Sequence, residues 1–498
     1  MPAIPAHVLL TPDEMKQADV MAAKSGIPSF DLMLRAGHAV AAAALRRFPG
    51  ARRYVVFCGP GNNGGDGYVA ALALIENGAD VAVFAAGDTA RLRGDARRAF
   101  EKWGGRPSAF EEFRPQAGDL IIDALFGAGL SRDLPGNVLQ LIADVNGASL
   151  PVLAVDLPSG ICGRTGRTRG AAFRALCTIT FMARKPGHSL LPGKSLCGDI
   201  EVFDIGIPAR IVLAAAGQIR ENRPELWRRF LPVVGADSHK YRRGHLGVFS
   251  GPSSSTGAAR LSALAGLKTG AGLVTVASPE DALPVNADHL TAIMLRQVDT
   301  LEDLHVWLEK AKISAFVLGP AFGIGAPARD FALALRDHPL VLDADGITSF
   351  KDEPRTLFDA FSSGETHLVL TPHEGEFGRL FPDLAADAGL GKVEKARKAA
   401  ERAHAVIVYK GADTVIAAPD GRANINANGP ASLATAGSGD VLAGMIGALL
   451  AQGMPAFEAA CAGVFLHGEA AHLAAAGLTA EDLAAQAGKA MAKLAGDL

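Results

Sequence analysis

The sequence predicts a protein of two α/β domains, and three observations support this prediction. The chain has 498 residues, whereas a single hydrophobic core stops growing at roughly 250–300 residues. From residue 50 onward, short runs of β-branched and aromatic residues alternate with longer runs rich in Ala and Leu, the pattern of a parallel sheet covered by helices. With 49% hydrophobic residues and 57 glycines, the composition is globular rather than disordered.

The expected elements form two series separated by a stretch of weak pattern around residues 209–228, which sets the predicted domains at 1–220 and 221–498. In the first series, a helix is expected at 68–77 and strands at 54–58, 81–84, 120–123, 152–156, 177–181 and 200–203. In the second, helices are expected at 257–269, 392–404 and 440–450, and strands at 246–250, 273–277, 316–319, 340–343, 367–371, 406–409 and 415–418. No fixed-period repeat relates the halves, so two different modules are joined.

Charge and residue usage exclude several classes of protein. A formal net charge of −3 would not attract nucleic acid or an acidic membrane surface. The longest apolar run, Val441–Ala451, is far shorter than the about 20 residues that span a bilayer, and the N-terminal residues lack the layout of a signal peptide. The five cysteines show neither a disulfide framework nor C-x-x-C spacing. We therefore expect a cytoplasmic protein with small anionic ligands.

A glycine-rich segment follows the first expected strand. Gly59–Gly67 reads GPGNNGGDG and precedes an Ala/Leu-rich helix. Glycines permit close backbone approach, and free N–H groups at a helix N-terminus favour a phosphate. The segment departs from G-x-G-x-x-G, and the alternative is a tight strand-to-helix turn. We interpret it as an anion-binding loop.

Polar residues follow two further strands of the first domain. Asp123 precedes the loop Gly127–Asp133, and Asp156 precedes Pro158-Ser159-Gly160. Ligands of open parallel sheets bind at the carboxyl ends of the strands, although an aspartate there can also cap the next turn. Asn63, Asp123 and Ser159 could also hold a hard cation through oxygen.

The motifs GPGNNGGDG, DALFGAGLSRD and AVDLPSG resemble, in order and spacing, those of the NAD(P)H-hydrate epimerases over roughly residues 10–215. The resemblance implies a three-layer, Rossmann-like domain that binds hydrated NADH or NADPH (NADHX or NADPHX). It implies potassium ligands Asn63, Asp123 and Ser159. It also implies that the hydrated cofactor contacts Asp156 and the residues Asn62, Asn63, Gly64, Gly65, Asp66, Gly127, Ala128, Gly129, Leu130, Ser131, Arg132 and Asp133.

The family reaction interconverts the two configurations at the hydrated C6 of the nicotinamide ring. A carboxylate there could transfer a proton and stabilise positive charge on the ring, and Asp156 is our catalytic candidate. Lys185, in the turn-like segment Arg184-Lys185-Pro186-Gly187, is expected to be exposed rather than to neutralise a phosphate.

The second domain carries its own glycine motif, Gly437-Ser438-Gly439-Asp440, at the start of an apolar helix. Its backbone N–H groups could bind a transferring phosphoryl group while Asp440 accepts a proton from the attacking hydroxyl. By itself, such an aspartate could merely stabilise the helix dipole. Polar loops after four other strands favour a site, and they include His373: Gly319–Gly323, Leu342–Gly346, Thr371–Glu376 and Lys410–Thr414.

These motifs resemble the ribokinase-like superfamily and, more narrowly, the NAD(P)H-hydrate dehydratases over about residues 229–495. The narrower resemblance rests on His239–Gly251, Thr256–Ala277, Thr371–Phe377, KGADT at Lys410–Thr414 and Gly437–Met445. It implies a three-layer fold in which the hydrated cofactor faces Gly257, Ala258, Gly319, Gly323, His373 and Asp440. The adenine nucleotide would face Lys410, Gly411, Ala412, Asp413, Thr414 and Gly439. One departure is Ala321 in GPAFG, where glycine is commoner.

The implied reaction is dehydration of the S form at the expense of ADP, or ATP, with magnesium bound to the nucleotide, giving AMP and phosphate from ADP. Phosphoryl transfer to the C6 hydroxyl makes a good leaving group, with Asp440 as the base. The resemblance also favours a homo-oligomer. Two alternatives stay open: a vitamin kinase, which shares the glycine motif, and a non-catalytic nucleotide-binding N-terminal module fused to an enzyme.

Overall fold

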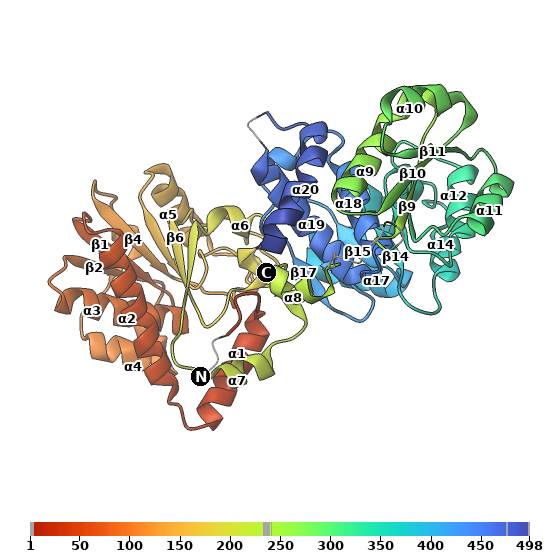
Figure 1. Cartoon of the computed structure of the whole chain (residues 1–498). Coiled ribbons are helices and arrows are strands. Elements are labelled where there is room, and N and C mark those ends of the chain that lie inside the picture. The colour runs from red at the N-terminus through yellow and green to blue at the C-terminus, as the bar shows by residue number, and fades with distance from the viewer. Residues whose placement is uncertain (1–3, 233–239, 241, 475–476, 497–498) are drawn as a thin grey trace. The chain divides into compact units, whose positions relative to one another are not determined.

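The computed structural model describes residues 4–232, 240, 242–474 and 477–496 (Figure 1). The chain divides into two compact units, Met1–Glu221 and Asn222–Leu498, here called the first and second units. No helix in the described part of the chain is both long and apolar enough to cross a membrane. All five cysteines are free and buried.

The sheet of the first unit has seven strands in the order β3-β2-β1-β4-β5-β6-β7, all parallel. Their bounds are β1 Arg53–Cys58, β2 Val81–Ala85, β3 Ser108–Ala109, β4 Asp119–Ala124, β5 Val152–Val155, β6 Cys177–Phe181 and β7 Asp199–Phe203. Strand order reverses between β1 and β4, which makes their carboxyl ends the switch point where open α/β sheets bind ligands.

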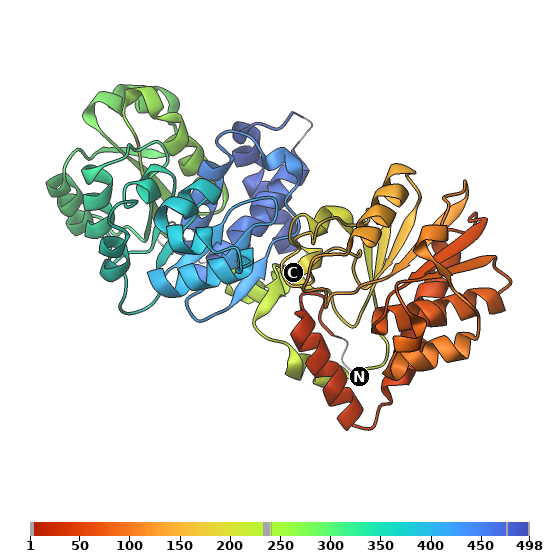
Figure 2. The same cartoon turned by 180° about the vertical axis from the view of Figure 1, so that it is seen from behind.

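Helices cover both faces of this sheet, so the first unit has three layers (Figures 1 and 2). α2 (Ser29–Arg47), α3 (Asn62–Glu76) and α4 (Gly94–Trp103) lie on one face, where Val56 joins their core. α5 (Gly136–Gly147) lies on the other face, where the next residue, Phe57, packs. Because successive side chains of β1 point to opposite faces of the sheet, this strand contributes to the cores on both faces. The remaining elements are α1 Pro12–Lys24, η1 Thr89–Arg91, η2 Phe110–Glu112, η3 Pro186–His188, α6 Gly193–Leu196, α7 Ala209–Ala215 and β8 Ile219–Glu221.

Nine strands of the second unit follow the order β11-β10-β9-β12-β13-β14-β15-β16-β17. They are β9 His245–Phe249, β10 Leu273–Ser278, β11 Met294–Gln297, β12 Ala315–Leu318, β13 Leu340–Leu342, β14 Leu368–Leu370, β15 Val406–Tyr409, β16 Val415–Ala417 and β17 Ala423–Ile425. Pairing is parallel from β11 to β15 and antiparallel from β15 to β17.

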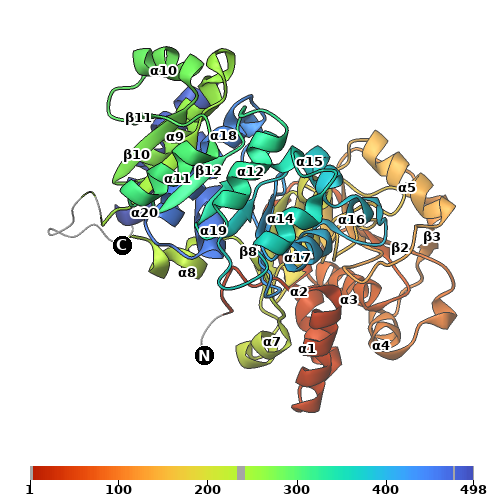
Figure 3. The same ribbon diagram turned by 90° about the vertical axis from the view of Figure 1, so that its right-hand side faces the viewer.

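The second unit is also three-layered (Figures 1 and 3). Four helices build the core on one face: α9 Gly257–Lys268, α18 Ser438–Ala451, α19 Ala456–Leu473 and α20 Ala480–Gly496. The other face carries α11 Leu301–Lys310, α12 Ala326–Ala334, α14 Pro354–Ala360 and α17 Lys392–Ala403. There Phe249 of β9 packs against the rings of Trp307 and Phe331. Shorter elements are α8 Pro224–Trp227, η4 Arg228–Phe230, η5 Ser253–Ser255, η6 Glu280–Ala282, α10 Leu283–His289, α13 Asp345–Thr348, α15 Glu374–Leu380, α16 Pro382–Ala386 and η7 Ala431–Leu433.

The predicted fold class is confirmed, and each expected strand is present within about two residues at either end. The short strands β3, β8, β11 and β17 were not expected from the sequence, because two to four residues carry too little periodicity to be recognised.

Candidate active sites

The first glycine segment is mostly helix rather than loop. Only Gly59–Gly61 form the turn after β1, and α3 begins at Asn62 with Gly61 as its N-cap. The expected helix start at Tyr68 is therefore wrong by six residues. Asn and Gly are weak helix formers, so the local sequence disfavours this turn. Packing overrides that preference, and Asn62, Asn63, Gly64, Gly65 and Asp66 lie in the first turns of the helix.

Close packing explains several of these glycines. A Cβ at Gly59 would lie 1.7 Å from the carbonyl oxygen of Leu125, and one at Gly64 would lie 1.9 Å from that of Gly59. A Cβ at Gly61, in contrast, would meet no atom within 4 Å. Gly59 and Gly64 thus let the turn lie against its neighbours, while Gly61 and the amides after it remain open to a ligand.

Asp123 and Ser159 are brought together at the ends of β4 and β5. The Ser159 amide donates to Asp123 Oδ2 and its hydroxyl donates to Asp123 Oδ1, both at 2.6 Å. The hydroxyl also accepts from the Phe126 amide at 2.9 Å. Asp123 is fully buried, and burial raises its pKa to about 6 against the lowering effect of these hydrogen bonds.

Asp156 follows β5 in a left-handed backbone conformation, with φ of 66°. Its Oδ1 accepts from Lys185 Nζ at 2.6 Å and from Thr180 Oγ1 at 2.9 Å. Its Oδ2 accepts from the Ala128 amide at 2.8 Å. Burial alone would raise the pKa of Asp156, but Lys185 and these hydrogen bonds outweigh it and lower the pKa to about 2. Asp156 is therefore ionised and fixed in orientation at neutral pH.

The expectation that Lys185 is exposed is wrong. Its side chain is 2% exposed, and Nζ also donates to Thr180 Oγ1 at 2.8 Å. His188 supports this arrangement, because its Nδ1 accepts from the Lys185 amide and Nε2 therefore donates to the Asp156 carbonyl, each at 2.8 Å. Burial lowers the pKa of His188 to about 4 and keeps the ring neutral. A turn-like local sequence gave no sign of the partner 29 residues away.

Two further carboxyl groups face this ion pair. Burial, together with the charges of Asp156 and Asp19, raises the pKa of Asp66 well above its usual range. Asp19 on α1 is an exposed residue. Partial burial of its carboxyl group nevertheless raises its pKa to about 6, against the lowering effect of the charge of Lys185. No motif marked Asp19, so its position was missed from the sequence.

The loop after β4 contributes backbone more than side chains. A Cβ at Gly127 would lie 3.0 Å from Asp156 Oδ2 and 3.1 Å from Asn63 Oδ1, so these three predicted residues meet. Among the residues that the structure describes, Asn63 Nδ2 has no hydrogen-bond partner and is buried. The rest of the predicted loop differs in burial: Ala128 and Leu130 are buried, while Gly129, Ser131, Arg132 and Asp133 are exposed.

In the second unit, the helices α9 and α18 run parallel to each other, and both begin at one edge of the site. α18 begins at Ser438, two residues earlier than expected, with Gly437 as N-cap at φ 81°. Ser262 Oγ on α9 donates to the Asp440 carbonyl at 2.7 Å, and a Cβ at Gly444 would lie 2.0 Å from the Ser262 carbonyl oxygen. The amides of Gly257 and Ala258 therefore open near those of α18, and both helix dipoles favour an anion.

Asp440 lies beside two other carboxylates and one lysine. Burial and the negative charges of Asp343 and Asp345 raise its pKa to about 6, against the opposing charge of Lys410. Lys410 Nζ donates to Asp343 Oδ1 at 2.7 Å and lies 3.9 Å from Glu376 Oε2. Burial lowers the pKa of Lys410, but these carboxylates outweigh it and raise the pKa. Lys410 is therefore charged.

The residues predicted to face the nucleotide differ in their burial and in their contacts with the rest of the protein. A Cβ at Gly439 would lie 3.4 Å from Lys410 Nζ, so this lysine stands at the glycine motif. Asp413 is buried and accepts from Lys392 Nζ at 2.6 Å, which ties it to the protein. Gly411 and Ala412 are exposed, and Thr414 Oγ1 closes the turn by donating to the Gly411 carbonyl at 2.7 Å.

His373 has a structural role that the sequence did not indicate. It is the N-cap of α15, and its Nδ1 accepts from the amides of Gly375 and Glu376 at 2.9 and 3.3 Å. Glu376 returns the bond by accepting from the His373 amide at 2.8 Å. The side chain of His373 is nevertheless 56% exposed, and its Nε2 lies 3.4 Å from Glu376 Oε1.

The loop after β12 is held by unusual backbone conformations. Gly319 has φ 123°, and a Cβ there would lie 1.9 Å from the Asp343 carbonyl oxygen. Ala321 has φ 52°, which is favourable for glycine and strained for alanine. The Gly323 amide donates to Asp345 Oδ2 at 3.0 Å, which joins this loop to the one after β13.

One predicted motif lies partly outside the residues that the structure describes. In the motif His239–Gly251, His239 and Tyr241 lie outside the described residues. Within the described ranges, no group of three His, Cys, Asp or Glu side chains is placed to hold a metal ion.

Comparisons with known proteins match both units. A family model described as NAD(P)H-hydrate dehydratase matches residues 246–493, and one described as YjeF-related protein N-terminus matches residues 29–187. A Moorella thermoacetica protein named bifunctional NAD(P)H-hydrate repair enzyme is 38% identical, over 94% of this chain and 92% of its own. The Escherichia coli protein of the same name is 35% identical, over 94% of this chain and 90% of its own.

Solved structures also resemble part of the chain. An ADP/ATP-dependent NAD(P)H-hydrate dehydratase from Bacillus subtilis, co-crystallised with ATP and Mg²⁺, is 25% identical. The match covers 55% of this chain and 98% of that one, with a TM-score of 0.47. A ribokinase-like superfamily protein from Enterococcus faecalis is 22% identical over 56% of this chain and 96% of that one, with a TM-score of 0.48.

Proposed function

The chain belongs to the bifunctional NAD(P)H-hydrate repair enzymes, and from this premise we propose how its two units divide the work. Relatives of that name match nearly the whole chain, so it is an epimerase and a dehydratase of hydrated NAD(P)H. A vitamin kinase fused to a non-catalytic module is not favoured. In our proposal, the first unit interconverts the S and R epimers, and the second dehydrates the S form using ADP or ATP.

In the first unit, we assign Asp156 an electrostatic role. A carboxylate with a pKa of about 2 is a weak proton acceptor at neutral pH but a strong fixed negative charge. When the C6–O bond of the hydrated ring breaks, its electron pair leaves on oxygen and positive charge spreads over C6 and the ring nitrogen. Asp156 would stabilise that charge, and water returning to the other face of C6 would give the opposite epimer.

The proton for the departing hydroxyl has a separate candidate. Burial and the charges of Asp156 and Asp19 raise the pKa of the Asp66 carboxyl well above its usual range, so it holds its proton to a higher pH than an ordinary aspartate does. Two neighbouring carboxyl groups with pKa values moved apart are the usual arrangement for an acid and a charge stabiliser. We assign Asp66 the proton donor role, with Lys185 as the positioning residue that keeps Asp156 ionised and oriented.

Potassium fits the oxygen groups at the ends of β4 and β5. Asp123 is a buried carboxyl whose described hydrogen bonds come from Ser159 and the Leu125 amide, without a cationic side chain. With the amide oxygen of Asn63, these are hard ligands suited to a hard cation. Asn63, Asp123 and Ser159 would hold the ion, which would supply positive charge near the phosphates of the hydrated cofactor.

In the second unit, Asp440 is the base for phosphoryl transfer. Its pKa of about 6 leaves it ionised at neutral pH while allowing it to accept the C6 hydroxyl proton. The hydroxyl oxygen then attacks the terminal phosphorus of the nucleotide, whose bond to the bridging oxygen breaks. Phosphate later leaves C6 as the ring nitrogen donates electrons, and loss of a C5 proton restores NAD(P)H. Amides of Ser438 and Gly439 and the charge of Lys410 would stabilise the phosphoryl oxygens.

Magnesium would accompany the nucleotide. It keeps most of its water and binds phosphates with one or two carboxylates, rather than requiring a protein cage. We further propose that the enzyme acts in the cytoplasm as a homo-oligomer, which light scattering of the purified protein would test.

The opposite pKa shifts of Asp156 and Asp440 are the observation that most favours this division. The test is to follow a mixture of both epimers to completion with purified protein, Mg²⁺, K⁺ and ADP or ATP. Full conversion to NAD(P)H is expected. Conversion that stops at the share of one epimer would refute the epimerase assignment, and no conversion with either nucleotide would refute the dehydratase assignment.

A further inference from the structure

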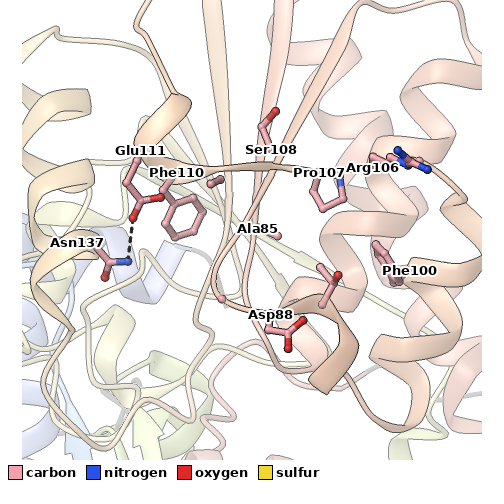
Figure 4. Close-up of a pocket in the computed structure, with 13 residues that line it drawn as sticks. Ala85, Asp88, Phe100, Arg106, Pro107, Ser108, Phe110, Glu111 and Asn137 are labelled. Atoms are coloured by element: carbon pink, nitrogen blue, oxygen red, sulfur yellow. Dashed lines mark hydrogen bonds between the residues drawn. The ribbon is translucent and has the colours of Figure 1, made fainter.

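A cavity of about 550 Å³ lies in the first unit beyond the ends of β2 and β3 (Figure 4). Its walls come from the segment after β2, the end of α4, η2 and the start of α5. Ala85 and Phe110 supply apolar surface, while Asp88, Arg106, Glu111 and Asn137 supply polar groups around it. This volume is within the range of small-molecule sites. None of these residues belongs to either site described above.

The cavity lies on the same sheet edge as Asp156, on the opposite side of the glycine turn. The Ala86 amide, at the end of β2, donates to the Cys58 carbonyl of β1 at 2.9 Å. Gly59, the first residue after β1, donates from its amide to the Ala124 carbonyl of β4 at 3.0 Å. The edge therefore runs in order from the cavity, past the N-terminus of α3, to Asp156 after β5.

The length of this path suits a dinucleotide. From the gap between β3 and β2 to β5 there are three to four strand spacings, which at about 4.8 Å each give roughly 17 Å. An extended dinucleotide carries its pyrophosphate in the middle and one nucleoside at each end. With the nicotinamide at Asp156 and the pyrophosphate at the N-terminus of α3, the second nucleoside reaches the cavity.

We propose that this cavity binds the adenosine end of the hydrated cofactor and that Arg106 binds the 2′-phosphate of the NADPH form. The proposal rests on the epimerase function of the first unit. Asp88, three residues past β2, and Glu111 offer carboxylate oxygens to ribose hydroxyls, as acidic residues after the second strand do in doubly wound sheets. Apolar atoms of Ala85, Phe100 and Phe110 offer a surface for the adenine ring.

Arg106 has the position and freedom that phosphate binding requires. It is exposed and lies in the short segment that connects α4 to β3. Among the described residues, its guanidinium has neither a hydrogen-bond nor an ion-pair partner. Glu111 across the cavity is held by Asn137, whose Nδ2 donates to Glu111 Oε1 at 3.5 Å (Figure 4). Guanidinium groups bind phosphate through paired N–H donors.

The test measures epimerisation of hydrated NADPH and hydrated NADH by the full chain without ADP or ATP, so that the second unit does not contribute. Arg106→Ala should raise KM for hydrated NADPH by roughly tenfold, the size of one charge-assisted hydrogen bond, and leave KM for hydrated NADH and both kcat values unchanged. Arg97, a half-buried arginine of α4 outside the cavity that pairs with Glu101, gives the control variant Arg97→Ala, which should change neither KM.

A filling variant gives an independent reading. Thr89→Trp places an indole in the cavity and should raise KM for both hydrated cofactors, whereas Ala90→Trp, exposed and outside the cavity, should not. Adenosine 2′,5′-bisphosphate should inhibit wild-type epimerisation competitively and inhibit the Thr89→Trp variant less. Unchanged KM values in Arg106→Ala and Thr89→Trp, with an active wild-type enzyme, would overturn the cavity proposal. Absence of epimerisation by the wild type would instead refute the proposed function.

Discussion

Asp156 lies directly after β5 and Asp440 lies in the first turn of α18, and their surroundings shift their pKa values in opposite directions. Asp156 faces a buried lysine and accepts three hydrogen bonds, which lower its pKa to about 2. Burial and the negative charges of Asp343 and Asp345 raise the pKa of Asp440 to about 6, against the charge of Lys410, which is hydrogen-bonded to Asp343.

Under the proposed division of work, this difference would let one residue type serve two reactions. A carboxylate that stays charged at every physiological pH stabilises a cation but exchanges protons poorly. A carboxylate with a pKa near neutrality is ionised often enough to accept a proton and basic enough to hold it. The groups around each aspartate therefore set its pKa, and the pKa sets the chemistry for which the carboxylate is suited.

Replacing Asp440, the proposed base of the second unit, should give the largest separation of the two activities. Asp440→Asn removes the proton acceptor, so dehydration should fall by roughly 10²–10⁴-fold while epimerisation remains at the wild-type rate. The two rates are measured separately, by NADH absorbance with ADP and by chromatography of the epimers without it. Loss of both activities in a folded variant would contradict separate sites.

Removing the partner of Asp156 should destabilise the first unit. Lys185→Met leaves a buried carboxylate without its cation, which should lower the free energy of unfolding by roughly 3–5 kcal/mol. Denaturant unfolding followed by fluorescence measures the change. The double variant Lys185→Met/Asp156→Leu should recover much of the loss, and exposed Lys102→Met is the matched control. Equal stabilities of Lys185→Met and wild type would show that the pair is not buried as described.

Acid should separate the two reactions by about one order of magnitude per pH unit. Asp440 binds a proton as pH falls through about 6, so dehydration by the second unit should decline roughly tenfold per unit below that pH. Asp156 stays ionised until pH approaches 2. At saturating K⁺, the bound cation should keep Asp123 ionised although burial raises its pKa to about 6, so epimerisation should change little between pH 5 and 7. Parallel pH profiles measured with saturating substrates would refute the different protonation states.

Alanine substitutions should distinguish packing glycines from ligand-facing ones. Gly64→Ala would force a Cβ to 1.9 Å from the Gly59 carbonyl oxygen, and overpacking of this kind costs roughly 1–3 kcal/mol. Gly61→Ala meets no atom within 4 Å and should leave stability nearly unchanged. Thermal unfolding of both variants measures the contrast. Equal losses would mean that the turn does not pack as observed.

The smallest expected effect concerns Ala321. Glycine relieves the strain of φ 52° but gains more freedom in the unfolded chain, so Ala321→Gly should stabilise the second unit by about 1 kcal/mol or less. Ala328→Gly, buried in α12 with ordinary helical geometry, should destabilise instead. A loss of stability in Ala321→Gly would show that the alanine is not strained.

Regular features of this fold were predictable from the sequence, whereas features made by tertiary contact were not. Strands such as β1 and β15 were recognisable in the sequence because each is a short run of β-branched and aromatic residues between polar or glycine-rich segments. The start of α3 at Asn62 was not predictable, because Asn and Gly disfavour helix and only close packing against Leu125 and Met33 holds that turn. Motifs located Asp156 and Asp440 but not the opposite shifts of their pKa values.

The missed site residues have the same explanation. Lys185 lies in a turn-like segment, and its burial depends on Asp156 and Thr180, which the fold brings to it. Asp19 belongs to a helix without a recognisable motif, and its effect on Asp66 depends on where α1 packs. Long-range partners decide both roles, and a single sequence does not contain them.

The central claim is that two independent sites act in succession, and mixing two variants tests it most directly. Asp156→Asn and Asp440→Asn are each checked for folding by circular dichroism and then given a mixture of both epimers with ADP, Mg²⁺ and K⁺. Asp440→Asn alone should form no NAD(P)H. Asp156→Asn alone should consume the S epimer and then slow to the uncatalysed rate of interconversion.

Together, the two variants should convert the whole mixture at a rate near that of the wild type. Conversion of both epimers at the wild-type rate by Asp156→Asn alone would contradict the account. So would failure of the folded variants to complement each other.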